Sequence, residues 1–253
     1  MNTLNTLVKP LFCAAALASV SLAAHSAGIP GQGTWETTLQ ARDINHDGAV
    51  DAYYDSTLNI SWLANMNAGA GSAFDNGSNT SDGRMTWDNA VAWADSLTQA
   101  GGGWRLPSFT PLDVGVPTTY PFGPFGPRLV DRARGELPHM FYVTLGNKGY
   151  CPSQTPCGDW LSVSAWGLRN TADFQNLQSG RYWTGESFVP DANQAFFFAT
   201  FDGLQSASGK NSEWYAVAVH DGDVTTAVPE PEALAMMLAG LAGIGFLVRR
   251  RRR

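Results

Sequence analysis

The feature that most restricts the fold of this chain is an apolar stretch at residues 233–248, followed directly by arginines. An α-helix over this stretch would span roughly 24 Å at ~1.5 Å per residue, somewhat less than the ~30 Å hydrocarbon core of a membrane. Flanking arginines can extend to the lipid headgroups, and local thinning of the bilayer can absorb the difference. Because arginines remain on the cytoplasmic side, the sequence predicts a transmembrane helix at 233–248 with the preceding part of the chain outside the cytoplasm. The arginines of this membrane stop are Arg249, Arg250, Arg251, Arg252 and Arg253.

The beginning of the chain has the composition of an export signal. Lys9 provides a positive charge, residues 11–24 are apolar except for two serines, and small residues follow at Ala24 and Ala27. A basic start, a short apolar core and a small-residue exit are typical of a secretory signal. We therefore predict that residues 1–27 are a signal peptide that is removed on export.

A short motif precedes the apolar stretch near the end of the chain: Pro229, Glu230 and Pro231. The motif, the apolar helix and the arginine cluster, in this order over residues 228–253, closely resemble the PEP-CTERM sorting signal. The resemblance implies a transient membrane anchor that an exosortase processes, in bacteria that make exopolysaccharide. It also implies the export machinery as a partner, and an inner-membrane-tethered intermediate before the cell surface, outer membrane or extracellular matrix. An ordinary single-span anchor is the alternative.

Between its two ends the chain is strongly acidic. The ends hold six of the 16 basic and two of the 22 acidic residues, so the remainder carries 10 basic and 20 acidic side chains. A surface of this sign repels nucleic acid and other polyanions, so we expect no nucleic-acid partner. The length favours one domain, with a lead at 28–51 and a globular part at 52–227.

Two cysteines, Cys151 and Cys157, lie close together in the globular part. An exported chain meets an oxidising compartment, which favours a short-loop disulfide. Two cysteines without nearby histidines make a poor zinc site, and a catalytic thiol would need electropositive surroundings. We therefore predict a structural disulfide.

The pattern of apolar residues predicts two helices and a β-rich remainder. Apolar residues recur at helical spacing after the N-cap candidate Thr86, and three glycines from Gly101 end that helix. A second helix is predicted over 136–145, where Pro138 is tolerated in the first turn. Strands are predicted over 53–63 (half-buried), 195–201 (buried on both faces) and 214–219. This combination indicates an α+β fold class.

Several segments together resemble the DUF1566 family, also called the Lcl C-terminal domain. They occur in family order and are 53–55, 58–63, 82–87, 104–107, 136–142, 182–185 and 216–219. The resemblance implies a C-type-lectin-like single domain, with two helices beside a small twisted antiparallel sheet and long loops. It marks Trp104, Arg105, Tyr182 and Trp183 as ligand-facing or structural. From its neighbours Trp104 and Leu106, Arg105 is expected to stack on an aromatic ring and to pair with a buried carboxylate.

The segment from Asp43 to Asp51 alternates oxygen-bearing residues as calcium loops do. The candidate ligands are Asp43, Asn45, Asp47, Ala49 (through its carbonyl) and Asp51. The twelfth position is Tyr54, where an acidic ligand belongs. Weak Ca²⁺ binding is therefore one interpretation, and an Asn/Asp/Gly-rich turn between two strands is the other.

The sequence offers little for catalysis. It has no nucleophile elbow, metalloprotease helix or phosphate-binding glycine loop. We therefore expect no enzyme, but a noncatalytic carbohydrate-binding or adhesion module associated with exopolysaccharide or biofilm. All nine tryptophans lie between the two ends, most of them expected in or near the core and a few available to stack on sugars. One alternative is a secreted carbohydrate-active hydrolase, whose acid pair would come from scattered carboxylates such as Asp159, Asp173 and Glu186. The other is a purely structural matrix protein.

Overall fold

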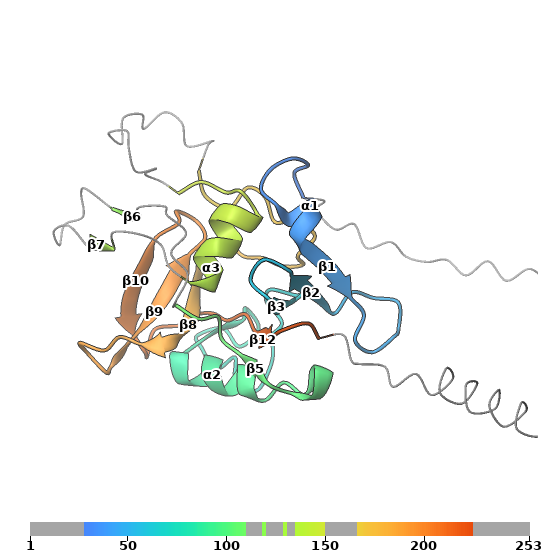
Figure 1. The fold of residues 1–253 in the computed structure, drawn as a ribbon. Coiled ribbons are helices and arrows are strands. Elements are labelled where there is room, and N and C mark those ends of the chain that lie inside the picture. Colours follow the sequence, from blue (N-terminus) through green and yellow to red (C-terminus); the bar gives the residue numbers. More distant parts are fainter. Residues whose placement is uncertain (1–27, 110–117, 120–128, 131–134, 150–165, 225–253) are drawn as a thin grey trace, which may run out of the picture.

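The structure is a computed structural model that describes residues 28–109, 118–119, 129–130, 135–149 and 166–224. The predicted signal peptide at 1–27, both cysteines and the sorting tail lie outside these described residues, so their predicted structures stay predictions. The architecture is rich in β-sheet and contains few helices (Figure 1).

Within the described ranges, no helix combines the length and the apolar character needed to cross a membrane.

One five-stranded sheet brings both ends of the described chain together. Its strands lie in the order β1-β2-β3-β12-β5, and every neighbouring pair is antiparallel. Their bounds are β1 Leu39–Arg42, β2 Ala52–Asp55, β3 Ile60–Leu63, β5 Trp104–Arg105 and β12 Val219–Asp221. The late strand β12 therefore lies between β3 and β5, and it fixes Arg105 beside the C-terminal part of the domain.

A second five-stranded sheet has the order β10-β9-β8-β11-β4. Its strands are β4 Arg84–Met85, β8 Arg181–Ser187, β9 Gln194–Ala199, β10 Gln205–Gly209 and β11 Trp214–Tyr215. The pair β8–β11 is parallel, whereas the other neighbours are antiparallel. The prediction of one small antiparallel sheet is thus wrong, because the described residues form two five-stranded sheets, one of them mixed, and a separate two-stranded pair.

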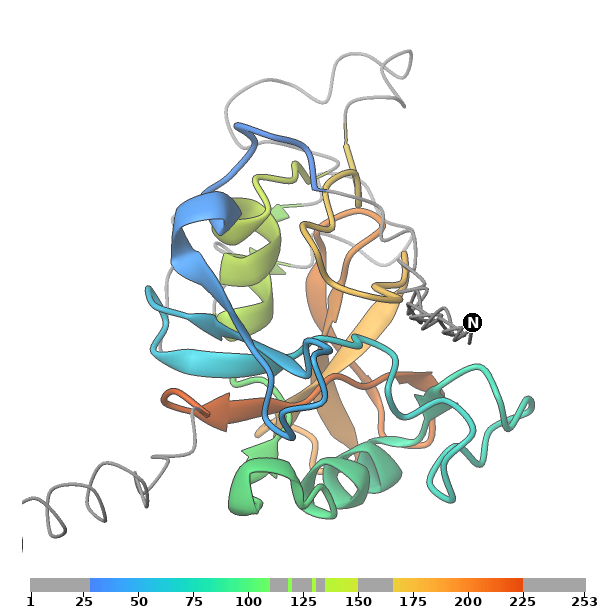
Figure 2. The same cartoon turned by 90° about the vertical axis from the view of Figure 1, so that its right-hand side faces the viewer.

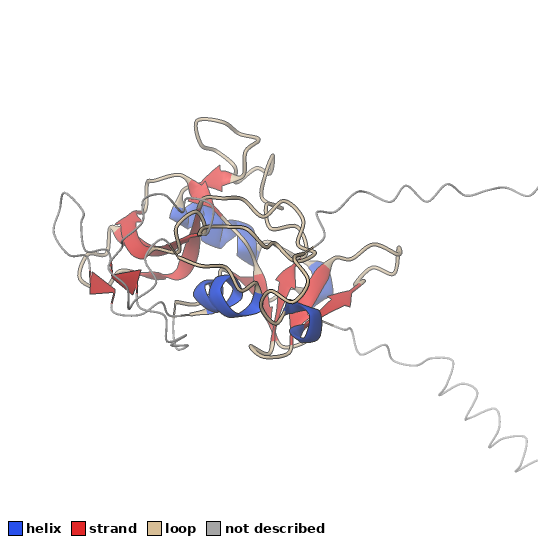
Figure 3. Cartoon of the chain, turned by 90° about the horizontal axis from the view of Figure 1, so that it is seen from above, coloured by secondary structure: helices blue, strands red, loops and turns tan. Residues whose placement is uncertain are grey.

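The remaining described elements are short, and loops make up much of the chain between them (Figure 3). Besides the two predicted helices, they are the helices α1 Trp35–Thr38 and η1 Gln99–Gly101 and the paired strands β6 Thr118–Thr119 and β7 Leu129–Val130.

The first predicted helix is present as α2 (Trp87–Asp95). It buries Ala90, Trp93 and Ala94, as its apolar spacing predicts. Thr86 occupies the N-cap position with an extended backbone, but its side chain makes no capping hydrogen bond. Beyond the helix, all three glycines that were predicted to end it have positive φ, a backbone conformation that favours glycine.

The second predicted helix is also present, with a change of pitch in its middle. It starts as α3 (Glu136–His139), with Pro138 in the first turn, and continues as a wider π-helical segment, η2 (Met140–Thr144). Gly146 and Asn147 follow its end, as the sequence indicated.

Two strand predictions need correction. The predicted half-buried strand at 53–63 is a hairpin of β2 and β3, whose turn includes Asn59 at φ 54° and whose β3 residues are all buried. The predicted strand at 214–219 is two short strands in different sheets, β11 and β12. The prediction of a central strand buried on both faces near 195–201 is confirmed by β9, which lies between β10 and β8.

Two apolar clusters explain why so many strand residues are buried. One cluster packs under α2 and includes Trp183, Trp104 and Leu106, whereas the other packs under α3 and η2 and includes Trp62 and Tyr182. Figures 1 and 2 show these two helices on opposite sides of the strands. Successive strand residues point to opposite faces, so both faces of the central strands are covered.

The segment between β11 and β12 illustrates this alternation. Ala216 and Ala218 belong to the cluster under α2, whereas Val217 and Val219 belong to the cluster under α3. All four residues are buried. Polar side chains are therefore excluded on either face of this segment.

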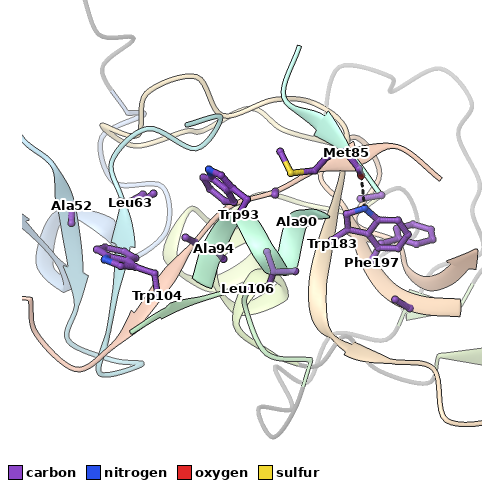
Figure 4. Packing of buried hydrophobic residues seen from close by; sticks show 14 of the residues in the cluster. Ala52, Leu63, Met85, Ala90, Trp93, Ala94, Trp104, Leu106, Trp183 and Phe197 are labelled. Carbon is purple, nitrogen blue, oxygen red and sulfur yellow. Dashed lines mark hydrogen bonds between the residues drawn. The ribbon is translucent and has the colours of Figure 1, made fainter. Parts of the chain in front are cut away.

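Trp183 is the clearest test of this packing. Its side chain is fully buried, and its indole Nε1 donates a hydrogen bond of 2.9 Å to the carbonyl of Met85 (Figure 4). We expect Trp183→Ala to lower the free energy of unfolding by about 3–5 kcal/mol, because it leaves a cavity and an unpaired carbonyl. Urea unfolding of the full chain in detergent micelles measures the change. Val189→Ala is the control, since that side chain is 93% exposed, and equal stabilities of the two variants would contradict this packing.

Candidate functional site

A pocket of about 430 Å³ lies where four segments of the chain meet. These segments are α2, the end of β5 with the residues that follow it, the start of α3 and the second half of β8. The pocket is lined by Val91, Asp95, Arg105, Leu106, Ser108, Glu136, Gly185 and Glu186. It therefore combines an apolar wall with several charged groups, as small-molecule sites do.

The strongest polar contact in the pocket joins Arg105 and Glu136. The guanidinium Nη1 and Nη2 lie 2.9 and 2.8 Å from the two carboxylate oxygens, so the pair is bidentate. Asp221, on β12, accepts a further hydrogen bond from the same guanidinium. The hydrogen bond to Glu136 is the main cause that raises the pKa of Arg105 above its ordinary value, although burial acts in the opposite direction.

Ser108 links Glu136 to the second glutamate of the pocket. Its backbone N–H donates to Glu136 at 2.6 Å, and its hydroxyl donates to Glu186 Oε1 at 2.7 Å. The backbone N–H of Phe109 donates to Glu186 Oε2, also at 2.7 Å. Ser108 therefore bonds to both carboxylates, and each carboxylate has a second partner of its own, Arg105 for Glu136 and Phe109 for Glu186.

The local sequence accounts for this arrangement. Gly135 has φ 93°, and a Cβ there would lie 2.2 Å from the carbonyl oxygen of Ser108. Only glycine fits this close approach, which lets the backbone N–H of Glu136 donate to the same carbonyl at 2.9 Å. On the other side, the N–H of Gly185 donates to the carbonyl of Pro107 at 2.9 Å, which fixes β8 against the pocket.

Of the residues that the sequence marked as ligand-facing or structural, three are part of the core. Trp104, Tyr182 and Trp183 are each at most 1% exposed, and their polar atoms bond to the backbone within the domain. Arg105 alone lines the pocket, and its predicted pairing with a buried carboxylate is confirmed by Glu136. The aromatic stacking expected of it is found at another arginine, Arg181, whose guanidinium lies 4.6 Å from the ring centre of Trp214.

The tryptophans follow the expectation of core or half-buried positions. Among the eight that the structure describes, four are buried and the other four are half-buried. A sugar-stacking platform of fully exposed indoles is therefore not present in the described part of the chain.

The residues of the calcium-like loop lie together, but they bond mainly to one another. The carboxylate of Asp43 accepts the N–H groups of Asp47 and Gly48, and Asp51 Oδ2 accepts those of Ile44 and Asn45. No group of three or more histidine, cysteine or acidic side chains suited to a metal occurs among the described residues. The calcium hypothesis therefore remains a prediction, and the alternative of a turn between β1 and β2 describes the observed loop.

Most of the pocket was missed by sequence reasoning. Glu136 was noted only at the start of a helix, Glu186 only as one of several scattered acids, and Ser108 not at all as a site residue. A signal did exist in Arg105, which was expected to have a carboxylate partner, but the sequence does not show which of 22 acidic residues provides it.

Comparison with known proteins identifies one segment. The family described as PEP-CTERM protein-sorting motif matches residues 227–253. This confirms the predicted sorting tail, whose signal exosortase recognises and which implies export through a membrane-anchored intermediate. No curated protein and no solved structure matches the chain.

The Arg105–Glu136 pair allows a test that separates buried from exposed charge. Glu136→Gln should lower the free energy of unfolding by about 2 kcal/mol, because it leaves the half-buried guanidinium with a neutral and therefore weaker partner. Asp221→Asn, at a side chain that is 78% exposed, should cost less than about 1 kcal/mol. Urea unfolding of the full chain in micelles measures both, and a larger loss for Asp221→Asn would overturn the assignment.

The calcium hypothesis predicts that Ca²⁺ raises the melting temperature of the full chain and that a chelator reverses the effect. Asp43→Ala and Asp51→Ala should each abolish the Ca²⁺-dependent difference, because they remove oxygen ligands. Asp88→Asn, an exposed acid on α2, should retain it. Titration calorimetry without any Ca²⁺ heat, together with unchanged melting, would rule the site out.

Proposed function

We propose that this chain is an exosortase-sorted protein of the cell surface or extracellular matrix whose globular domain binds carbohydrate without cleaving it. The observation that carries the sorting part is the PEP-CTERM motif at residues 227–253. The binding part is supported by the pocket, where an apolar wall stands beside polar groups whose positions the backbone fixes. We further propose that the protein is associated with exopolysaccharide or biofilm, because bacteria with PEP-CTERM sorting signals make exopolysaccharide.

We also propose that the domain is related to the DUF1566 family and has a C-type-lectin-like architecture. The segments that carry this resemblance contact one another across both sheets. The segment 82–87 pairs with 214–215, which in turn pairs with Tyr182, and 104–105 pairs with β12. The Arg105–Glu136 pair joins two further segments, 104–107 and 136–142. This mutual contact supports reading the segments as one structural unit.

The noncatalytic proposal is supported by the hydrogen bonds that Glu136 accepts in the pocket. Both oxygens of Glu136 accept hydrogen bonds from Arg105, and one of them also accepts the N–H of Ser108. A general acid must donate a proton to a substrate, whereas this carboxylate accepts three hydrogen bonds and is ion-paired with Arg105. Such bonding suits a positioning role.

A hydrolase is the second candidate, because Glu136 and Glu186 lie in the same pocket and both bond to Ser108. Incubation of the full chain with the exopolysaccharide of its host distinguishes the two. The proposal expects retention of the polymer without new reducing ends. Release of reducing ends that Glu186→Gln abolishes would replace binding with hydrolysis, whereas neither retention nor cleavage would favour a purely structural matrix protein.

The sorting proposal predicts distinct products for two variants of the tail. Deletion of residues 227–253 should move the globular part from the membrane fraction to the soluble periplasmic or culture fraction, because the anchor is lost. Glu230→Ala should instead leave the full-length chain in the membrane, because exosortase no longer recognises it. Cell fractionation followed by mass spectrometry measures both outcomes. Glu36→Ala, outside the tail, serves as the control. Normal processing of Glu230→Ala would contradict the role of the motif.

A further inference from the structure

The pocket has an unbalanced charge. Arg105 is its one described cation, and its charge is already satisfied by Glu136 and by Asp221. Glu186 and Asp95 also line the pocket, and neither forms an ion pair among the described residues. Within the described part of the chain, a ligand in the pocket therefore meets two carboxylates that have no paired cation, and such carboxylates repel anions and attract cations.

Glu186 is prepared to accept further hydrogen bonds. Each of its oxygens accepts one bond from residues 108–109, whereas a carboxylate has about four acceptor positions. The two bonds fix the side chain, so its remaining acceptor positions need not be ordered when a ligand arrives. A fixed and partly satisfied carboxylate of this kind suits a charge-assisted hydrogen bond to a cationic donor.

Gly185 leaves space beside the pocket, at the register shift of β8 between Trp183 and Ser187. It lies inside β8 and does not have the positive φ that requires glycine. A Cβ would lie 3.5 Å from the carbonyl oxygen of Leu106 and 3.8 Å from its Cβ, which are ordinary contacts. Glycine inside a strand marks either a bulge, as β8 has here, or the close approach of a ligand or backbone. The missing side chain leaves room for an occupant on the pocket side of β8.

The apolar wall restricts what this occupant can be. Val91 of α2 and Leu106 line the pocket, and Figure 4 shows Leu106 beside Ala90 and Ala94 on the α2 side. A hydrated metal ion gains nothing from contact with apolar side chains. In addition, the described residues contain no cluster of three or more histidine, cysteine or acidic side chains suited to a metal. A sugar ring offers both an apolar C–H face and polar substituents, which matches the two sides of the pocket.

From these observations we infer that the pocket recognises an amino sugar with a free, protonated amine, held by a salt bridge from its ammonium group to Glu186. The apolar face of the sugar ring packs against Leu106 and Val91, and Asp95 adds attraction at the rim. This inference rests on the proposed carbohydrate-binding function and names the chemical class of the ligand.

A matched pair of probes tests the inference. Short β-1,4-linked glucosamine oligomers and fully N-acetylated oligomers of equal length differ only in the charge and substitution of the amine. Titration calorimetry on the full chain in nonionic detergent at mildly acidic pH should give about tenfold or tighter binding of the free-amine oligomer, because only this oligomer offers a charged donor.

Charge-matched variants separate recognition by the pocket from general attraction of a polycation to an acidic protein. Glu186→Gln should remove the preference for the free amine, whereas Asp88→Asn, which loses the same charge outside the pocket, should retain it. Gly185→Val should weaken binding of both oligomers by filling the pocket. Thermal melting checks that each variant folds, and Gly185→Val provides the test should Glu186→Gln unfold.

The possible outcomes distinguish the amine inference from the broader carbohydrate-binding proposal. Equal binding of both oligomers, unaffected by Glu186→Gln, would overturn the amine inference and leave the carbohydrate-binding proposal standing. Equal losses for Glu186→Gln and Asp88→Asn would reduce the preference to general charge attraction and also overturn the inference. Binding of neither oligomer would overturn the inference, and absence of any retention of the host polysaccharide would then remove the proposed function as well.

Discussion

The arrangement of the domain around its pocket depends on one ion pair, between the half-buried Arg105 and the buried Glu136. The two residues lie 31 positions apart, and their bidentate bond joins strand β5 to the first turn of α3. A buried charge is costly unless it is paired and hydrogen-bonded, so neither residue can leave the other without penalty. Glu136 also accepts the N–H of Ser108, whose hydroxyl in turn donates to Glu186. The ion pair therefore helps to set the positions of both glutamates in the pocket.

Secondary structure could be predicted from the sequence where it depends on a local pattern of apolar residues. The helical spacing after Thr86 and the two-faced burial of β9 were both predictable, because side-chain periodicity directly reports which faces are covered. The hairpin within 53–63 was missed because its turn depends on Asn59 in a left-handed conformation and on the Asp55 carboxylate, which accepts the N–H groups of Thr57 and Leu58. These are details of turn chemistry inside a continuous apolar pattern.

The pocket was not predictable for a different reason. Its lining residues come from four separated segments, and only the tertiary fold decides which carboxylates meet which donors. Residues such as Trp183, which looked suited to stacking on a ligand, are instead fully buried. Large aromatic side chains contribute most when they are removed from water, so a tryptophan-rich sequence indicates a core before it indicates a surface.

The position of β11 and β12 has a consequence for biogenesis. Both strands come from residues 214–221, yet each occupies an interior position in its own sheet, and β4 and β5 have these strands as their partners. A polypeptide that leaves the cytoplasm from its N-terminus therefore cannot close either sheet until nearly the whole domain has been translocated. The sorting motif begins at residue 227, immediately beyond this last structural segment. The last strands of the domain and the sorting motif therefore cross the membrane in close succession, so the sheets can close only shortly before the motif arrives.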